Sequence, residues 1–200
     1  EYNHALEYSI LKANSLNKPL IVFFGLNENF PNANTRNISF MLEGLYEVEK
    51  SLEDREIKFV TWKKKPEIGV TEISNDASVV VVDKGYQRFE QDWRKYVAKN
   101  IECPLIEIET NTVIPVEEAS KKEEYAAATI RPKINKLLNS YLSPLSLSNP
   151  RIRSLSFRID SLNMDEIDEI IKSLKIDKSV KAAPYLFGGT SEAKNHLEYF

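Results

Sequence analysis

Two apolar runs that do not alternate with polar residues constrain the fold more than any other feature of this sequence. They occupy residues 20–24 and 78–83, and the second consists mostly of valine. A strand with one face in water alternates between apolar and polar side chains, whereas a strand inside a parallel sheet is covered on both faces. We therefore expect both runs to be strands within a parallel sheet.

The segments around these runs have the periodicity of further strands and of helices. Further strands are expected at residues 57–62 and 104–108, with 112–116 as a continuation of the last one, and helices at 2–13, 34–54 and 89–100, with a weaker helix or turn at 68–73. Alternating helices and strands with short links indicate an α/β fold, a Rossmann-like doubly wound parallel sheet with right-handed crossovers. The pattern starts with a helix that leads into a buried strand, whereas a doubly wound sheet normally has a strand before that helix. We therefore expect the first strand to be missing and one central strand position of the sheet to be vacant.

Residues 122–134 mark the point at which this alternation stops, and they indicate a joint between two bodies. Thr129 is expected to cap the helix that follows, with Pro132 in the first turn. Turn-forming residues are then frequent, as in a linker. We expect an α/β domain at residues 1–142, a linker at 143–160 and the beginning of an all-α domain at 161–200.

Charge and cysteine content limit which binding partners and which cellular compartment we expect. With 27 basic and 30 acidic residues, the formal net charge of −3 gives no overall attraction to nucleic acid, so DNA contact requires a local patch. Arg151, Arg153 and Arg158 are a candidate patch, although ordinary ion pairs are the simpler interpretation. The single cysteine, Cys103, fits a reducing compartment, and no apolar run approaches the ~20 residues of a membrane span. We expect a cytoplasmic protein without membrane contact.

The sequence lacks the motifs of the common self-contained active sites. It has no glycine-rich nucleotide loop, no nucleophile elbow and no His or Cys cluster, and its histidines, His4 and His196, lie at opposite ends. We therefore expect no catalytic residue and no metal site in this chain.

A ligand site is instead expected from the architecture, because ligands of open parallel sheets bind beyond the carboxyl ends of the strands. The candidate cofactor-binding residues follow the two apolar runs and are Phe24, Gly25, Leu26, Lys84, Gly85 and Tyr86. The glycines permit close backbone approach, and Tyr86 and Lys84 could stack on and pair with a flat anionic chromophore or nucleotide. The alternative is that both segments are ordinary turns.

Several separated motifs share their order with one known family. They are Asn3-x-Ala5-Leu6; Thr35-Arg36 with Phe40-Met41-Leu42, Gly44-Leu45 and Glu47-Val48-Glu49; Val82-Asp83 with Trp93 and Val97-Ala98; residues 124–134; and Phe187-x-Gly189 with Ala193, Leu197 and Phe200. Together they resemble the class II cyclobutane pyrimidine dimer DNA photolyases. Residues 124–134 resemble the stretch that leaves the antenna domain of that family, and the last motif resembles the opening helix of its flavin-binding domain.

The resemblance implies a modular protein. A Rossmann-like N-terminal domain would hold an antenna chromophore, which is a deazaflavin, a folate or a flavin, and a large helical domain would hold FAD and damaged DNA. Light-excited reduced FAD would donate an electron to the pyrimidine dimer, which splits and returns it. This is a deoxyribodipyrimidine photo-lyase, a carbon–carbon lyase of DNA repair. The family pattern also implies a monomer, an inactive isolated chain, and an interdomain role for Tyr125, Arg131 and Lys133.

Two departures from the family pattern leave other hypotheses open. Ala128 stands where the family tends to have arginine, and Glu117 and Glu118 stand where it has apolar or aromatic residues. The alternatives are a non-catalytic nucleotide- or flavin-binding α/β module, a light sensor derived from a photolyase, and a fragment without a function of its own.

Overall fold

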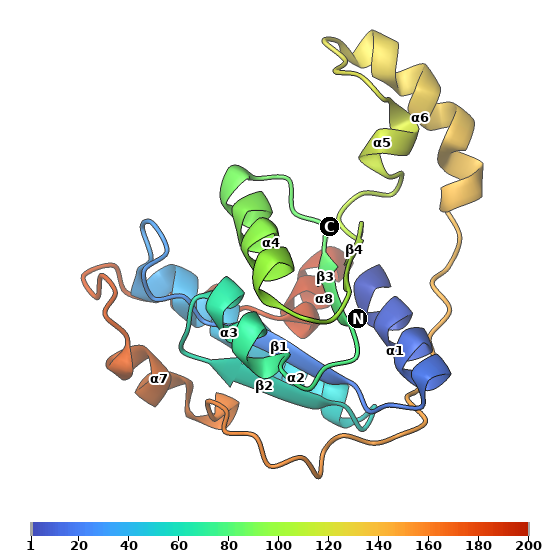
Figure 1. Cartoon of the computed structure of the whole chain (residues 1–200). Coiled ribbons are helices and arrows are strands. Elements are labelled where there is room, and N and C mark those ends of the chain that lie inside the picture. The colour runs from blue at the N-terminus through green and yellow to red at the C-terminus, as the bar shows by residue number, and fades with distance from the viewer. Residues whose placement is uncertain (1, 200) are drawn as a thin grey trace.

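A computed structural model describes residues 2–199, in which helices alternate with short strands (Figure 1). The strands are β1 (Ile21–Gly25), β2 (Lys58–Trp62), β3 (Val80–Asp83) and β4 (Leu105–Ile108). The helices between and beyond them are α1 (His4–Leu16), α2 (Thr35–Glu53), α3 (Pro66–Ile73), α4 (Arg88–Asn100), α5 (Val116–Ala119), α6 (Ala127–Tyr141), the 3₁₀ helix η1 (Met164–Glu166), α7 (Ile167–Ser173) and α8 (Thr190–Glu198). The predicted α/β class is confirmed.

The strands form two separate parallel pairs. β1 lies beside β2, with Ile21 opposite Lys58 and Gly25 opposite Trp62, and β3 lies beside β4, with Val80 opposite its first residue. Within residues 2–199, no ladder of hydrogen bonds joins β1 to β3. The sheet is therefore divided into two halves, as expected for a sheet in which one central strand position is vacant.

Asparagine side chains fix the helices on either side of β1. The Asn3 side-chain oxygen accepts a hydrogen bond from Leu6 N at 2.7 Å, and that of Asn34 accepts one from Asn37 N at 3.1 Å. These bonds satisfy amide groups that every helix leaves free at its N-terminus. Asn17 ends α1 in the left-handed conformation, with φ at 52°. These caps thus fix where α1 begins and ends, before β1, and where α2 begins, after β1.

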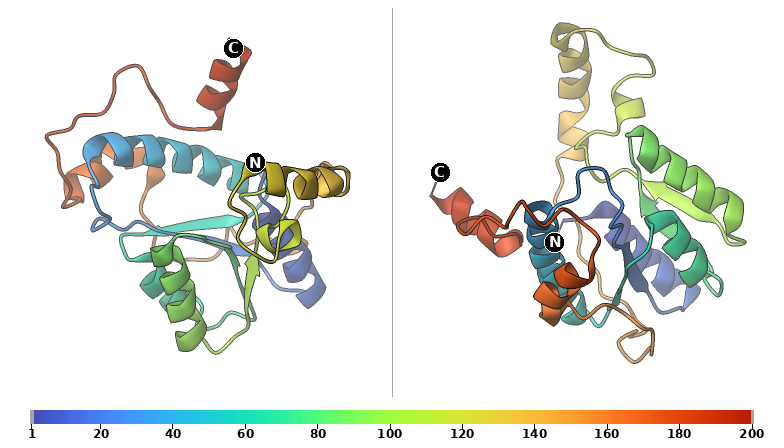
Figure 2. Two further views of the ribbon diagram at one scale, coloured as in Figure 1. Left: turned by 90° about the horizontal axis from the view of Figure 1, so that it is seen from above. Right: turned by 90° about the vertical axis from the view of Figure 1, so that its left-hand side faces the viewer.

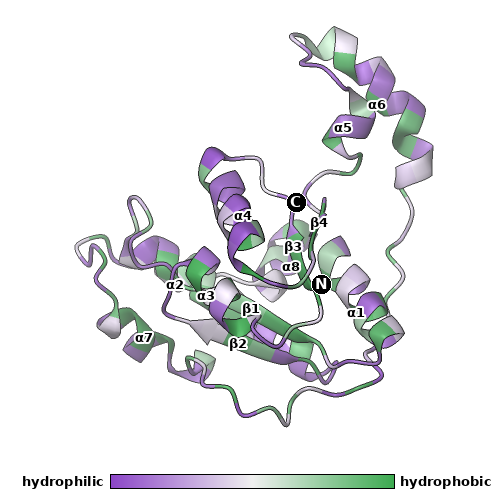
Figure 3. Cartoon of the chain, in the orientation of Figure 1, coloured by the Kyte–Doolittle hydropathy of each residue, from purple (hydrophilic) through white to green (hydrophobic). Residues whose placement is uncertain are grey.

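The apolar core lies mainly on the β1–β2 half. Figure 2 shows α2 on one face of this strand pair and α3 and α4 on the other. One core cluster joins β1, α2 and the C-terminal segment through Leu26, Ile38, Leu42, Met164, Ile170 and Leu174. A second cluster joins α1, α2 and β2 through Ile10, Leu52, Ile57 and Phe59. By contrast, β3 and β4 contain no buried residue, although β3 is strongly apolar (Figure 3).

The segment after α6 runs back along the outer edge of β2. Ser154 Oγ accepts a hydrogen bond from Lys58 N at 2.7 Å, and Ser161 Oγ accepts one from Thr61 N at 2.9 Å. Leu162 N donates to the Thr61 carbonyl at 2.9 Å. These bonds substitute for a neighbouring strand at an edge that would otherwise be free. The segment that the sequence marks as linker-like is therefore fastened to the α/β body.

α5 and α6 project away from the rest of the molecule, and α6 contains no buried residue (Figure 1). The prediction of Thr129 as the cap is wrong, because α6 begins at Ala127 with Ala126 as its N-cap residue. The Thr129 hydroxyl donates to the Ala126 carbonyl at 2.8 Å from within the helix. Pro132 consequently lies in the second turn rather than in the first.

The expected continuation of β4 at residues 112–116 is also wrong. Residues 112–114 belong to a bend, and Val116 is already the first residue of α5. Val116 N donates to Glu109 Oε1 at 2.6 Å, and Pro115 has no N–H to offer to a ladder. The chain therefore turns away from the sheet. No helix among residues 2–199 is both long enough and apolar enough to cross a membrane.

Candidate functional site

The residues expected at the end of β1 take part in packing. Leu26 is 1% exposed and belongs to the first core cluster, against which Phe24 also packs. Leu26 N donates to the Trp62 carbonyl at 2.8 Å and so extends the pairing with β2. A β-carbon at Gly25 would lie 2.7 Å from Pro66 Cα, so this glycine allows the start of α3 to approach β1.

The residues expected at the end of β3 meet around Glu109, which follows β4. Lys84 Nζ lies 3.6 Å from Glu109 Oε2 and 3.0 Å from Glu117 Oε1. The Tyr86 hydroxyl donates to the Glu109 carboxylate, as does Thr112 Oγ1 at 3.0 Å. Our sequence analysis did not single out Glu109, although a carboxylate directly after the neighbouring strand was the available signal.

The hydrogen bonds of this cluster set its ionisation. Burial alone would raise the pKa of the Glu109 carboxyl, but hydrogen bonds from Tyr86, the Val116 amide and Thr112 outweigh burial and lower that pKa below its ordinary value. The hydrogen bond to Glu117 raises the pKa of Lys84. Burial, and then the contact with Glu109, raise the pKa of Tyr86. At neutral pH Glu109 is therefore a carboxylate, Lys84 an ammonium group and Tyr86 a neutral phenol.

This arrangement limits what the edge of the sheet can bind. The Tyr86 side chain is 38% exposed, so its ring can stack on a flat ligand. Two carboxylates already balance the charge of Lys84, so Lys84 offers no unpaired cation to a phosphate. A β-carbon at Gly85 would lie 2.4 Å from Glu90 Cβ, so the space beside this glycine is filled by the start of α4. The edge therefore suits stacking better than it suits anion binding.

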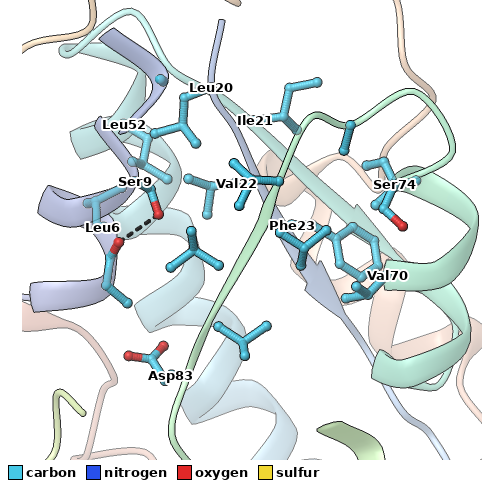
Figure 4. Close-up of a pocket in the computed structure, with 18 of the residues that line it drawn as sticks. Leu6, Ser9, Leu20, Ile21, Val22, Phe23, Leu52, Val70, Ser74 and Asp83 are labelled. Atoms are coloured by element: carbon cyan, nitrogen blue, oxygen red, sulfur yellow. Dashed lines mark hydrogen bonds between the residues drawn. The ribbon is translucent and has the colours of Figure 1, made fainter. Parts of the chain in front are cut away.

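The six candidate residues do not converge on one cavity. A cavity of about 1180 Å³ lies between the two strand pairs, and the residues that line it include Phe23 and Asp83 but none of the six (Figure 4). Lys84 and Tyr86 share Glu109, whereas Phe24 and Leu26 face the core. Among residues 2–199, no three His, Cys, Asp or Glu side chains are grouped to hold a metal ion.

The residues expected at the interdomain joint differ in their surroundings. Lys133 Nζ pairs with Glu124 and lies 3.1 Å from Ser120 Oγ. Hydrogen bonds from Lys133, and also from Thr129 and Ser120, lower the pKa of Glu124 from its ordinary 4.5 to about 2. Lys133 thus fastens α6 to the segment that follows α5. Tyr125, in contrast, is 90% exposed, and Arg131 is exposed as well.

A contact between α2 and the start of α8 was not predicted. Gly188 N donates to Glu43 Oε2 at 2.6 Å, and Ser191 N donates to Glu47 Oε2 at 3.0 Å. A β-carbon at Gly188 would lie 1.9 Å from the Phe40 carbonyl oxygen, so only glycine lets the two backbones meet. Carboxylates are favourable at a helix N-terminus, where amide groups are free and the dipole is positive. The bonds from Ser191 accordingly lower the pKa of Glu47.

Among the three candidate patch arginines, Arg153 Nη1 pairs with Glu56 Oε1 at 3.2 Å, and its side chain is 76% exposed. This pair agrees with the simpler interpretation of that residue, an exposed ion pair.

Comparisons with known proteins identify relatives that are similar to this chain in sequence. The family model for DNA photolyase matches residues 1–151. A deoxyribodipyrimidine photo-lyase of Methanothermobacter thermautotrophicus is 39% identical over 202 residues, which cover 100% of this chain and 44% of that protein. One from Arabidopsis thaliana is 30% identical over 177 residues, which cover 85% of this chain and 36% of that protein. The chain therefore spans less than half the length of these relatives.

The fold has a solved counterpart as well. The crystal structure of an archaeal photolyase from Sulfolobus tokodaii superposes with a TM-score of 0.71 at 18% identity, covering 98% of this chain and 43% of that one. That structure holds two FAD molecules and implicates a novel light-harvesting cofactor. The family match over residues 1–151 and the identity along the whole length of the chain lead to one conclusion: this chain belongs to the DNA photolyase family.

Proposed function

We propose that this chain is the N-terminal part of a deoxyribodipyrimidine photo-lyase, a lyase that uses light to split cyclobutane pyrimidine dimers in DNA. The observation that carries the proposal is the 39% identity to the Methanothermobacter thermautotrophicus photo-lyase over the whole chain. The photo-lyase of Potorous tridactylus also matches 99% of the chain, at 27% identity. Membership of class II, which the motifs of residues 35–49 and 124–134 suggest, is part of the proposal.

FAD is the proposed cofactor, because the Sulfolobus tokodaii relative contains it. When bound and reduced, FAD would supply the electron that splits the dimer. Its site, and the site for damaged DNA, are proposed to lie mainly in the helical domain outside this chain, since the chain covers 43% of that relative. The residues of this chain that would support the flavin domain are Glu43 and Glu47, which hold the start of α8.

The proposed domain organisation is an α/β antenna domain at residues 1–142, a connection at 143–160 and the beginning of the helical domain at 161–200. The joint residues have two roles in this scheme. Tyr125 and Arg131 are exposed and would meet the helical domain, whereas Lys133 braces α6 through Glu124. The full protein would act as a cytoplasmic monomer.

An antenna chromophore, which is a deazaflavin, a folate or a flavin, is proposed at the carboxyl ends of β1 and β3. The residues at this edge of the sheet fit such a chromophore only in part. The exposed ring of Tyr86 would stack on the chromophore, and Lys84 would have to leave its carboxylate partners to contact an anionic group. Replacing Tyr86 with alanine should reduce the chromophore absorbance that co-purifies with the full-length protein, whereas Tyr96→Ala, at a tyrosine of similar exposure on α4, should not.

The test of the function uses the full-length protein with reduced FAD and an oligonucleotide that contains one cyclobutane thymine dimer. Blue light should restore the intact thymines, as measured by chromatography, and neither a dark sample nor a sample without protein should do so. Bound, reduced FAD without light-dependent repair would contradict the proposal. That outcome would favour the second candidate, a flavin-binding light sensor derived from a photolyase.

A further inference from the structure

Lysine occupies every third position of residues 172–181, the segment at and after the end of α7. All four lysines are exposed, and they are Lys172, Lys175, Lys178 and Lys181. Asp177 is the only acidic residue among them, so this segment has a formal charge of +3 within a chain whose formal net charge is −3. The segment is therefore a local basic patch of the kind that contact with nucleic acid requires.

The chain after α7 passes beside the start of α2 (Figure 2), and backbone hydrogen bonds hold it there. Asp177 N donates to the Ala33 carbonyl at 3.3 Å, and Thr35 N donates to the Asp177 carbonyl at 3.0 Å. Further along, Arg36 Nε donates to the Lys181 carbonyl at 3.2 Å. The segment is therefore fixed in position, although most of it lies outside helices and strands.

Apolar side chains between the lysines anchor the same segment to the core. Leu174 is 2% exposed and belongs to the first core cluster, against which Ile176 also packs. The exposed lysines therefore extend from a backbone that is already held in place. Such a surface loses less conformational entropy on binding than a mobile basic tail does.

Three of the four lysines have no carboxylate partner. Lys172 Nζ pairs with Glu169 Oε1 at 2.6 Å. In the described part of the chain, by contrast, Lys175, Lys178 and Lys181 form no ion pair. Their charges are therefore available to an external anion.

The carboxylates beside the segment are held by other groups of the chain. The Asp177 carboxylate accepts hydrogen bonds from Ser179 N at 2.8 Å and from Ser179 Oγ at 2.7 Å. Glu28 Oε2 accepts a hydrogen bond from Lys175 N at 2.8 Å and lies 3.1 Å from Lys63 Nζ. Neither carboxylate forms an ion pair with a lysine side chain of the segment.

A row of separate ammonium groups suits an anion that is itself extended. Residues that lie three apart along a chain can be separated by up to about 10 Å, so one small anion would not contact all of these lysines. Lysine binds phosphate as a point charge without fixed geometry, and contacts to phosphate carry no sequence information. The row therefore fits the phosphate backbone of a nucleic acid.

We propose that Lys175, Lys178 and Lys181, together with Arg36 in the first turn of α2, contact the phosphate backbone of DNA. That turn contains no acidic residue to offset Arg36. The choice of DNA among extended polyanions rests on the proposed function, but this surface is separate from the proposed site for the pyrimidine dimer. The contact would raise the affinity for DNA of any sequence and leave the light reaction unchanged.

Salt-dependent binding to DNA tests the contact. The full-length protein would be titrated in the dark against a fluorescein-labelled undamaged duplex of about 20 base pairs, at about 50 to 200 mM salt, and followed by anisotropy. The triple variant Lys175→Gln, Lys178→Gln, Lys181→Gln should bind at least about tenfold more weakly at the lowest salt. The slope of log K against log salt should become shallower by about 2 to 3, because each lost phosphate contact removes about 0.9. Unchanged affinity and slope overturn the proposal.

A second triple variant controls for net charge. Lys18→Gln, Lys95→Gln, Lys99→Gln removes the same charge from exposed lysines outside the segment. Two of these lie on α4, on the opposite face of the β1–β2 pair from α2 (Figure 2). This control should bind DNA nearly as the unmodified protein does. Equal losses in the two triple variants would assign the effect to overall charge and overturn the proposal.

Lysine acetylation followed by mass spectrometry locates the contact in the unmodified protein and needs no variant to fold. The duplex should slow acetylation of Lys175, Lys178 and Lys181 at least about threefold and leave Lys18 and Lys99 unchanged. Polyglutamate of equal charge should protect them less. Equal protection by polyglutamate, or no protection by DNA, overturns the assignment to a nucleic acid.

The proposed function and this contact can fail separately. At saturating protein and under blue light, the triple variant of the segment should repair a thymine dimer as completely as the unmodified protein does. A loss of dark DNA affinity in that variant supports the contact even if the unmodified protein repairs no dimer. Complete repair by all forms, with equal dark affinity for DNA, would leave the proposed function intact and overturn the contact.

Discussion

The two strand pairs are built from similar apolar sequences, yet they differ in how completely they are covered. β2 contains the buried residues Phe59, Val60 and Thr61, whereas β3 and β4 contain none. β2 has β1 on one side and the fastened C-terminal segment on the other. β3 has β4 on one side and the cavity on the other. The difference shows that an apolar run is buried only when its neighbours are in place.

The largest expected effect compares core packing in the two halves. Leu42 is fully buried in the cluster on β1 and α2, so Leu42→Ala should lower the free energy of unfolding by ~2–5 kcal/mol. Leu105 of β4 is half-buried beside the cavity, so Leu105→Ala should cost less than ~2 kcal/mol. Urea denaturation measures both values. Equal losses would mean that the β3–β4 half is packed as firmly as the other.

The second effect tests the contact that joins the β1–β2 half to α8. A β-carbon at Gly188 would meet the Phe40 carbonyl oxygen at 1.9 Å, so Gly188→Ala should destabilise by ~1–3 kcal/mol or detach α8 from α2. Gly44 is the matched control, because a β-carbon there would lie 3.6 Å from its nearest neighbour, Gly189 N. Gly44→Ala should stabilise the interior of α2 by ~0.5–1 kcal/mol. Loss of stability in both variants would contradict the close approach at Gly188.

A smaller effect depends on pH at the same contact. The pKa of Glu47 is lowered below its ordinary 4.5 by Ser191, so the contribution of this carboxylate is complete above pH 4.5. It is lost as the pH falls through the lowered pKa. The Ser191 amide resonance in NMR should follow this titration, with a stability change of ~0.3–1 kcal/mol. Glu47→Gln should remove the pH dependence, and a titration that persists in this variant would assign it elsewhere.

The smallest effect concerns α5 and α6, which follow the β3–β4 half. Carboxyl NMR should give Glu124 a pKa of about 2, and Lys133→Met should raise it toward 4.5. Lys136→Met, on the exposed side of the same helix, is the control and should leave the value unchanged. Neither change should alter the free energy of unfolding of the main body, because α6 has no buried residue. An ordinary pKa for Glu124 in the unmodified chain would contradict the pairing of Lys133 with Glu124.

Hydrophobic periodicity was sufficient to predict the four strands and the long helices, because it reports which faces must be buried. It failed where a long-range partner decides the local structure. Residues 112–116 turn away from the sheet because the Glu109 carboxylate accepts a hydrogen bond from the Val116 amide. The contacts of Tyr86 with Glu109 and of Ser191 with Glu47 also join segments whose proximity follows only from the tertiary fold. Such pairs leave no periodic signal in the sequence.

Hydrogen exchange in the 200-residue chain tests the difference in coverage most directly. The amides of Phe23 and Val81 face the cavity, whereas the amide of Leu26 donates to Trp62 O of β2. Because no strand within residues 2–199 pairs with Phe23 or Val81 on the cavity side, their amides should exchange faster than that of Leu26. Equally slow exchange at all three amides would contradict the account.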